Sequence, residues 1–446
     1  MTDLPIPGAA AAPRPAGKSL LEEDARMKRR NAAEKRFELY GMAAIVAGVL
    51  ALVILLASIL GNGLSSFRQT FVTFPVPLLA GPIEEAEASI VKTSKYRDIL
   101  AAALIAKVEE GGTSPEGMDS ADIAAILSGD AASTFRDFVN ANPEAIGETL
   151  DFEFLANGRI DGFFKGRVTA ESAVLDGNVT PDQLLLARAL AETGAMETRF
   201  NWDFFTNADA SDQRPEAAGL GVAILGSLYM MLVVLCLALP IGVAASIYLE
   251  EFAPRNRITD VIEVNISNLA AVPSIVFGIL GLAIFINVAG LPQSAPIVGG
   301  LVLTLMTLPT IIIATRSALK AVPPSIRDAA LGVGASKLQS VFHHVLPLAA
   351  PGILTGTIIG LAQALGETAP LLLIGMVAFV AEYPDAPPEG LFDPASALPV
   401  QIYNWTQRSD PAFVERASGA IIVLLAFLLV MNAVAILLRR RFERRW

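Results

Sequence analysis

Cysteine and histidine are almost missing from this sequence of 446 residues. It contains one cysteine, Cys236, and two histidines, His343 and His344. A single cysteine excludes a disulfide within the chain, and because Cys236 lies inside an apolar run we expect a small buried hydrophobe there. The two histidines are adjacent, which suits one metal ion poorly, and no cysteine or carboxylate stands at ligand spacing from them. The sequence therefore predicts no metal site.

Motifs for nucleotide binding and for catalysis are missing as well. No segment matches the phosphate-binding pattern G-x-x-x-x-G-K followed by Ser or Thr, and Gly332 and Gly334 lack the third glycine of a dinucleotide-binding fingerprint. So few cysteines and histidines leave no Ser–His or Cys–His set for covalent catalysis. We therefore expect a protein that is not an enzyme, without catalytic residues and without a cofactor bound by this chain.

Negative charge is concentrated in one segment. The net charge is −11 at pH 7, yet residues 62–217 alone contain 12 Lys and Arg against 25 Asp and Glu, and the rest of the chain is close to neutral. No basic patch interleaved with aromatic residues occurs, so we expect no nucleic-acid partner. The acidic segment is long enough to bury its own core, and we expect a separate domain there.

Apolar residues are abundant. They make up 53% of the sequence, and the mean hydropathy is +0.53. Many of them stand in apolar runs of about 20 residues, long enough to cross a bilayer as helices. The sequence therefore predicts an all-α polytopic membrane protein of about six transmembrane helices in contact with membrane lipid. The predicted spans are residues 41–60, 220–249, 267–288, 296–315, 349–380 and 418–438.

Basic residues indicate the orientation of these spans. Lys and Arg gather in the N-terminal tail, in the loops after the second and fourth spans and at the C-terminal end, whereas the short loops of the other side hold only Arg408 and Arg416. The positive-inside rule then predicts that both termini are cytoplasmic and that the acidic segment lies on the far side. The first span is longer than the apolar part of a signal peptide and is expected to be an anchor. The predicted regions are a cytoplasmic tail 1–40, an anchor 41–61, a periplasmic domain 62–217, a five-span core 218–438 and a basic tail 439–446.

The acidic segment mixes helical and strand-like patterns. Residues 96–108 have helical apolar spacing, and Thr180 followed by Pro181 predicts the start of a second helix. Residues 152–155 and 159–168 alternate over short distances and favour strands or turns. We expect an α+β domain inserted between the first two spans, and interpret it as a solvated structural or docking module because it carries no readable motif.

The loop 316–348 has more local structure than most membrane loops. Ser325 precedes Asp328, and Ser336 precedes Gln339, by the three residues of a capping box, and glycines stand between the two pairs. The pattern predicts two short helices that form a rigid cytoplasmic projection, suited to docking a soluble partner.

This loop resembles the EAA loop of ABC-importer permeases, whose pattern is Glu-Ala-Ala, three residues, Gly, nine residues, Ile, any residue, Leu-Pro. Asp328 stands in place of the Glu, and His344 in place of the Ile. The resemblance implies contact with an ATPase subunit through Asp328, Ala329, Ala330, Gly334, Ala335, Ser336, Leu346 and Pro347.

Other stretches are similar to the phosphate-importer permease of the PstA type, in the same order, over residues 204–446. The resemblance implies an ABC type I importer fold in a bacterial inner membrane and transport of inorganic phosphate. It also implies a second permease of the PstC type, an ATPase dimer of the PstB type that binds ATP and Mg, and a periplasmic phosphate-binding protein of the PstS type. The first forty residues and the acidic segment fall outside this core and look like an added extension. Another small oxyanion is the alternative substrate, and a membrane sensor is the alternative class of protein. The similar stretches are residues 204–206, 228–230, 239–242, 247–251, 272–278 and 365–371.

A substrate pathway is predicted around Glu367. It is the one acid well inside a predicted span, where an ionisable group usually faces a cavity or a partner. Gln363 lies one turn earlier on the same face, at a position where the phosphate family often has Arg, and Thr368 follows directly. Arg316 ends the fourth span, either as a snorkelling anchor or as a charge that attracts the anion.

Prolines and small residues shape the predicted spans. Pro240, Pro273 and Pro309 are each expected to break a membrane helix, either at a wet cavity or as a packing kink. Small residues at every fourth position predict a close helix contact, with a sister permease or within this bundle. They are Gly352, Gly356, Gly360 and Ala364.

Overall fold

The computed structural model describes residues 25–112, 118–377 and 379–442, so residues 1–24 and 443–446 of the two predicted tails lie outside the described residues. The chain forms two compact units, residues 1–58 and 59–446. In its described part the first unit is one helix, α1 (Ala25–Gly63), which continues into the second unit. Its apolar side chains are exposed along its length, as expected for a helix surrounded by lipid.

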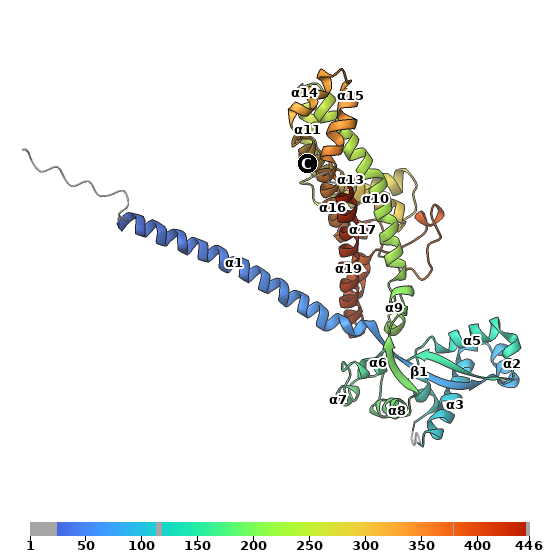
Figure 1. Ribbon diagram of the computed structural model, residues 1–446. Coiled ribbons are helices and arrows are strands. Elements are labelled where there is room, and N and C mark those ends of the chain that lie inside the picture. The colour runs from blue at the N-terminus through green and yellow to red at the C-terminus, as the bar shows by residue number, and fades with distance from the viewer. Residues whose placement is uncertain (1–24, 113–117, 378, 443–446) are drawn as a thin grey trace, which may run out of the picture. The chain divides into compact units, whose positions relative to one another are not determined.

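The insert (residues 62–217) folds around a three-stranded antiparallel sheet of order β2–β1–β3 (Figure 1). Its core joins Phe74 of β1 to Tyr96 and Phe135 on two helices, all three fully buried. The strands are β1 (Arg68–Pro77), β2 (Thr149–Leu155) and β3 (Met196–Phe200). The helices are α2 (Ala80–Ala88), α3 (Lys92–Glu110), α4 (Ser120–Ala124), α5 (Ala131–Ala141), α6 (Gly158–Phe164), α7 (Ala170–Ala173), α8 (Pro181–Glu192) and α9 (Asp203–Thr206).

Most local patterns of the insert predicted its elements. The helix expected over 96–108 lies within α3, and α8 begins at Pro181 with Thr180 and Gln183 in a reciprocal capping box. No strand forms at 159–168, because residues 159–164 lie in α6, and a turn follows over residues 165–168. Asn157 caps that helix by accepting a hydrogen bond from the Arg159 N–H.

An ion pair on the surface of the insert predicts a pH dependence of stability. Arg136 and, to a lesser degree, Lys92 donate hydrogen bonds to Glu87 and lower its pKa to about 2. A lowered carboxyl pKa stabilises the fold fully above its unfolded value, near 4.5, and this stabilisation is lost as the pH falls towards 2. Glu87→Gln should therefore lower the unfolding temperature at pH 6, and the difference from the wild type should shrink between pH 5 and pH 2.5. Glu84→Gln, at an exposed position, is the control. A difference in unfolding temperature between Glu87→Gln and the wild type that is equal at pH 6 and pH 2.5 would contradict the prediction.

Long helices form the second part of this unit. Five helices in the described chain are long and apolar enough to cross a membrane, and six spans result if the bent pair α11–α12 counts as one. The neighbours α10, α13, α16 and α19 run side by side (Figure 1). The elements are α10 (Gly221–Ile247), α11 (Arg257–Leu269), α12 (Ser274–Gly281), α13 (Pro296–Lys320), α16 (Leu346–Gly366), α17 (Ala369–Leu373), α18 (Leu398–Gln407) and α19 (Pro411–Phe442).

Two predicted spans differ from the structure. The span at 267–288 is two helices bent by 102° between Leu269 and Ser274, and α12 continues as a π-helix over Leu282–Val288. The apolar run at 349–380 is interrupted in sequence by Gly366, Glu367 and Pro370, and the structure breaks there: α16 ends at Gly366, and the short α17 follows it. These two interruptions lie against each other, because a Cβ added to Gly278 would be only 2.7 Å from Pro370 Cα.

Of the three prolines expected to break helices, only Pro273 does so. It is the N-cap of α12, whereas Pro240 and Pro309 lie inside α10 and α13, which run through them. Neighbouring helices and local adjustments tolerate a missing N–H at these sites. The expectation for Cys236 was also wrong, because its side chain is exposed on the surface of α10.

The stripe of small residues on α16 packs within this bundle, against α13. A Cβ on Gly352 would lie 2.7 Å from Ala318 Cβ, and one on Gly356 would overlap with Ala314. The close approach of two backbones therefore requires these glycines.

Filling this seam should destabilise the protein. Gly356→Ala forces α13 and α16 apart and is expected to cost about 1–3 kcal/mol of stability, the usual range for overpacking. Adding Ala314→Gly removes the clashing methyl group and should restore part of the loss. Gly366→Ala on the same helix is the control, because nothing lies within 4 Å of its added Cβ. The measurement is the thermal unfolding midpoint in detergent, and equal midpoints for the two single variants would refute the packing argument.

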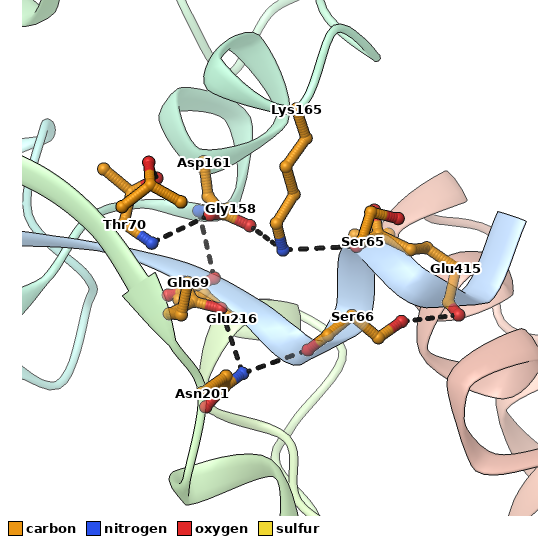
Figure 2. A network of polar contacts seen from close by, with 12 residues as sticks. Ser65, Ser66, Gln69, Thr70, Gly158, Asp161, Lys165, Asn201, Glu216 and Glu415 are labelled. Carbon is orange, nitrogen blue, oxygen red and sulfur yellow. Dashed lines mark hydrogen bonds and ion pairs between the residues drawn. The ribbon is translucent and has the colours of Figure 1, made fainter. Parts of the chain in front are cut away.

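A buried polar network joins the insert to the first turns of α19 (Figure 2). Lys165 Nζ lies 2.7 Å from Asp161 Oδ2 and 3.1 Å from Glu415 Oε1, and the three side chains are at most 5% exposed. Arg167 also pairs with Glu415, and Ser66 Oγ donates to the Glu415 carbonyl at 2.8 Å. The insert is therefore fixed to α19.

Arg416, the next residue of α19, extends this network. Its guanidinium donates to the carbonyls of Ala218 and Glu216, each at 2.6 Å, and to Gln69 Oε1 at 3.0 Å. Burial raises the pKa of Glu216, although Ser128 Oγ donates to its carboxylate at 2.6 Å. The charged contacts thus reach the strand β1, the segment before α10 and the start of α19.

Candidate functional site

The coupling loop (residues 316–348) forms two helices that project from the ends of α13 and α16. They are α14 (Pro324–Gly332) and α15 (Lys337–Ser340), and a π-helical turn connects α15 to α16. Ser336 and Gln339 form the predicted capping box. The predicted cap at Ser325 was wrong, because α14 begins at Pro324 with its fixed φ and leaves Ser325 in the first turn. Gly334, at φ +90°, makes the turn between the helices.

A small apolar core holds the loop against the bundle. Ile247 at the end of α10 and Leu319 at the end of α13 pack against Val341 and Val345 of the π-helical turn. All four side chains are buried. The loop is therefore a structured body that is packed against the ends of α10 and α13.

The loop exposes an acid and several apolar residues to solvent. Asp328 and Ala329 are exposed, whereas Ala330 is buried. Near them Leu331, Val333 and Leu338 are 47%, 86% and 56% exposed. The motif residues alone did not indicate that these three apolar side chains are exposed. Exposed apolar groups around a charge are typical of a protein–protein interface. The remaining predicted contact residues Gly334, Ala335, Ser336, Leu346 and Pro347 lie in the turn, in α15's cap and at the start of α16.

Two adjacent acids in the π-helical turn that follows α10 (Tyr248–Phe252) bind basic residues of the loop region. Glu250 lies 3.4 Å from Arg316 and 3.5 Å from Lys320, whereas Glu251 accepts hydrogen bonds from Arg327. The sequence indicated these two acids only as part of the stretch 247–251, which is similar to the phosphate-importer permease. An acid pair at the end of an apolar span is the signal that could have drawn attention to them.

The structure separates Arg316 from the other residues of the predicted substrate pathway. Arg316 contacts Glu263 of α11 at 2.6 Å in addition to Glu250. Glu367 and Thr368 lie in the break between α16 and α17, and Gln363 is exposed one turn earlier. Helices α13 and α16 run antiparallel and Gly352 faces Ala318, so Arg316 lies roughly 20 Å from Glu367 along the bundle. Arg316 thus neutralises acids at one end and does not complete a site with Glu367.

Two known protein families match different parts of the chain. Residues 238–446 match the family described as binding-protein-dependent transport system inner membrane component, and residues 24–174 match a domain of unknown function, DUF3333. The probable ABC transporter permease protein YqgI of Bacillus subtilis (strain 168) is 34% identical over 230 residues, 49% of this chain and 78% of that protein. The phosphate transport system permease protein PstA of Mycobacterium leprae is 32% identical over 253 residues, 56% of this chain and 79% of that protein. PstA of Xylella fastidiosa (strain Temecula1) is 32% identical over 228 residues, 51% of this chain and 77% of that protein.

The apolar spans and the family match define a multi-pass membrane protein of the transport permease class. The chain belongs to the inner-membrane permeases of ABC importers, as a permease of the PstA type.

Proposed function

We propose that this chain is the permease subunit of an ATP-driven importer of inorganic phosphate. The observation that carries the proposal is its identity of 32% to a phosphate transport permease over 79% of that protein's length, together with a structured loop at the position of the family's ATPase-coupling motif. The chain would supply the membrane path, and ATP hydrolysis would take place on a separate ATPase dimer of the PstB type. A PstC-type permease would complete the pathway.

The mechanism follows from rigid-body movement. Closure of the ATPase dimer on ATP would displace the coupling loop, and the helices joined to it would alternate access to substrate delivered by a PstS-type binding protein. The interruptions at Pro273 and Glu367, which meet through Gly278 and Pro370, are the proposed place where the substrate passes. Broken helices present backbone amides and helix ends that can bind an anion. Since Gln363 is neutral, uncharged donors or a partner subunit would bind the phosphate.

We place the insert on the periplasmic side and the coupling loop with both termini in the cytoplasm. Ala223, near the start of α10, packs with the residues that follow the insert, and Ile247, near its end, packs with the coupling loop. A helix of 27 residues is about 40 Å long, enough to cross the bilayer. In this arrangement the insert, fixed to α19, would serve as a docking platform for the binding protein.

Phosphate uptake tests this proposal. Cells that lack this chain should lose high-affinity uptake of radiolabelled phosphate under phosphate limitation, and expression of the chain should restore it. The purified chain should also bring a second permease and an ATPase with it in detergent. Unchanged phosphate uptake together with lost uptake of sulfate or another small oxyanion would refute the substrate. Recovery with a kinase or regulator alone would refute the transport function.

A further inference from the structure

The coupling loop is joined to α10 through charged contacts. Arg327 of α14 donates to Glu251 Oε1 from Nε at 3.0 Å and from Nη2 at 2.6 Å. Lys337, at the start of α15, lies over the ring of Phe252, 5.3 Å from its centroid. Glu251 and Phe252 both belong to the π-helical turn Tyr248–Phe252 that directly follows α10, so both helices of the loop contact one turn that is distant in the sequence.

The backbone of this turn has a rare helical conformation. Residues Tyr248–Phe252 form a π-helical turn, a conformation found mostly as short insertions and often at functional sites. Glu251 is only 7% exposed, so its carboxylate is largely removed from water and interacts more strongly with Arg327 than a surface acid would.

Arg327 also fixes the end of α13. Its Nη1 donates to the carbonyl of Val322 at 2.8 Å, and its Nη2 donates to the carbonyl of Leu319 at 2.9 Å. A guanidinium has five donors in a planar fork, so one side chain can hold α10, the end of α13 and α14 at fixed angles. A lysine could keep the charge but not this geometry.

We propose that Arg327 and Glu251 are positioning residues of the transport cycle, and that their ion pair is the joint through which movement of α14 reaches α10. The inference rests on the proposed function, because it assumes that an ATPase moves the loop. The bidentate contact transmits rotation as well as displacement, since the fork fixes the angle between its partners. Glu250 contacts α13 through Arg316 and Lys320, so the two adjacent acids attach α10 to two different elements.

The test uses the complete complex in liposomes, with the binding protein inside or outside as transport requires, and measures phosphate transported per ATP hydrolysed. Arg327→Gln and Glu251→Gln should each lower this ratio at least about fivefold, the lower end of usual coupling effects, while complex yield and basal ATP hydrolysis stay unchanged. Arg327→Lys should lie between Arg327→Gln and the wild type. Arg257→Gln, an exposed arginine at the start of α11, is the matched control and should keep the wild-type ratio.

The reversed pair, Arg327→Glu with Glu251→Arg, separates a joint from a general structural role. It should recover part of the ratio lost in the single reversals, because the ion pair forms again without the contacts to Leu319 and Val322. A wild-type ratio in Arg327→Gln would overturn the proposal, as would a double reversal no better than either single one or a loss that only follows complex yield. A wild-type complex that hydrolyses ATP but moves no phosphate would contradict the proposed function instead, and binding-protein stimulation of ATP hydrolysis would then report on the joint.

Discussion

Glu415→Ala should lower the stability of the protein by about 3–5 kcal/mol, the range measured when one partner of a buried ion pair is removed. The variant leaves the cations of Lys165 and Arg167 at the junction of the insert and α19 without their shared carboxylate. Among the described residues, Asp161 would remain as the carboxylate that pairs with both cations, and Lys165 is only 5% exposed, so water replaces the lost carboxylate poorly. The measurement is the thermal unfolding midpoint of the full chain in detergent.

Two further variants make this result specific. Glu192→Ala removes an acid that is 74% exposed and pairs with Arg188 at 3.7 Å, and it should change the midpoint little. Adding Lys165→Met to Glu415→Ala removes one of the stranded cations and should recover part of the stability, because a well-packed apolar side chain often replaces a buried charge without loss. The argument fails if Glu415→Ala and Glu192→Ala unfold at the same temperature.

Asp328→Lys should strongly weaken assembly with the proposed ATPase subunit while the chain still inserts into the membrane. Asp328 is exposed on α14, and surface substitutions usually change stability by less than about 0.5 kcal/mol, so the fold should persist. At an interface, however, reversing a charge places like charges together and weakens binding by several kcal/mol. We expect at least a tenfold lower recovery of the ATPase, which corresponds to about 1.4 kcal/mol.

The measurement is the amount of ATPase that co-purifies per amount of this chain in the membrane fraction. Asp260→Lys provides the same change of charge at an exposed position of α11 and should leave the recovery unchanged. Recovery of the ATPase at the wild-type level with Asp328→Lys would exclude this face of the loop as the docking surface.

Features that depend on neighbouring residues in the sequence were predicted well. The caps at Thr180 and Ser336, the break at Pro273 and the positions of most spans follow from hydrogen bonds or apolar runs within a few residues. Predictions from local patterns were wrong where one pattern is compatible with two local structures. Ser325 had the spacing of a cap, but the neighbouring Pro324 starts the helix instead.

Features that depend on contacts between distant segments could not be predicted. The position of Arg316 at the end of a span was compatible with a snorkelling anchor or with a charge that attracts the anion. Its partners Glu250 and Glu263 come from two other helices, and the sequence did not indicate them. The small residues on α16 predicted a close contact, but only the fold shows that α13 is the partner.

The sequence by itself determined a polytopic helical protein with an acidic folded insert and a structured loop, because helix formation in a bilayer and capping act over short stretches of chain. Only the tertiary structure decided which charges neutralise one another. Arg327 meets Glu251, and Lys165 meets Glu415, across 76 and 250 residues of sequence, and such pairs form only where the packed helices bring them together.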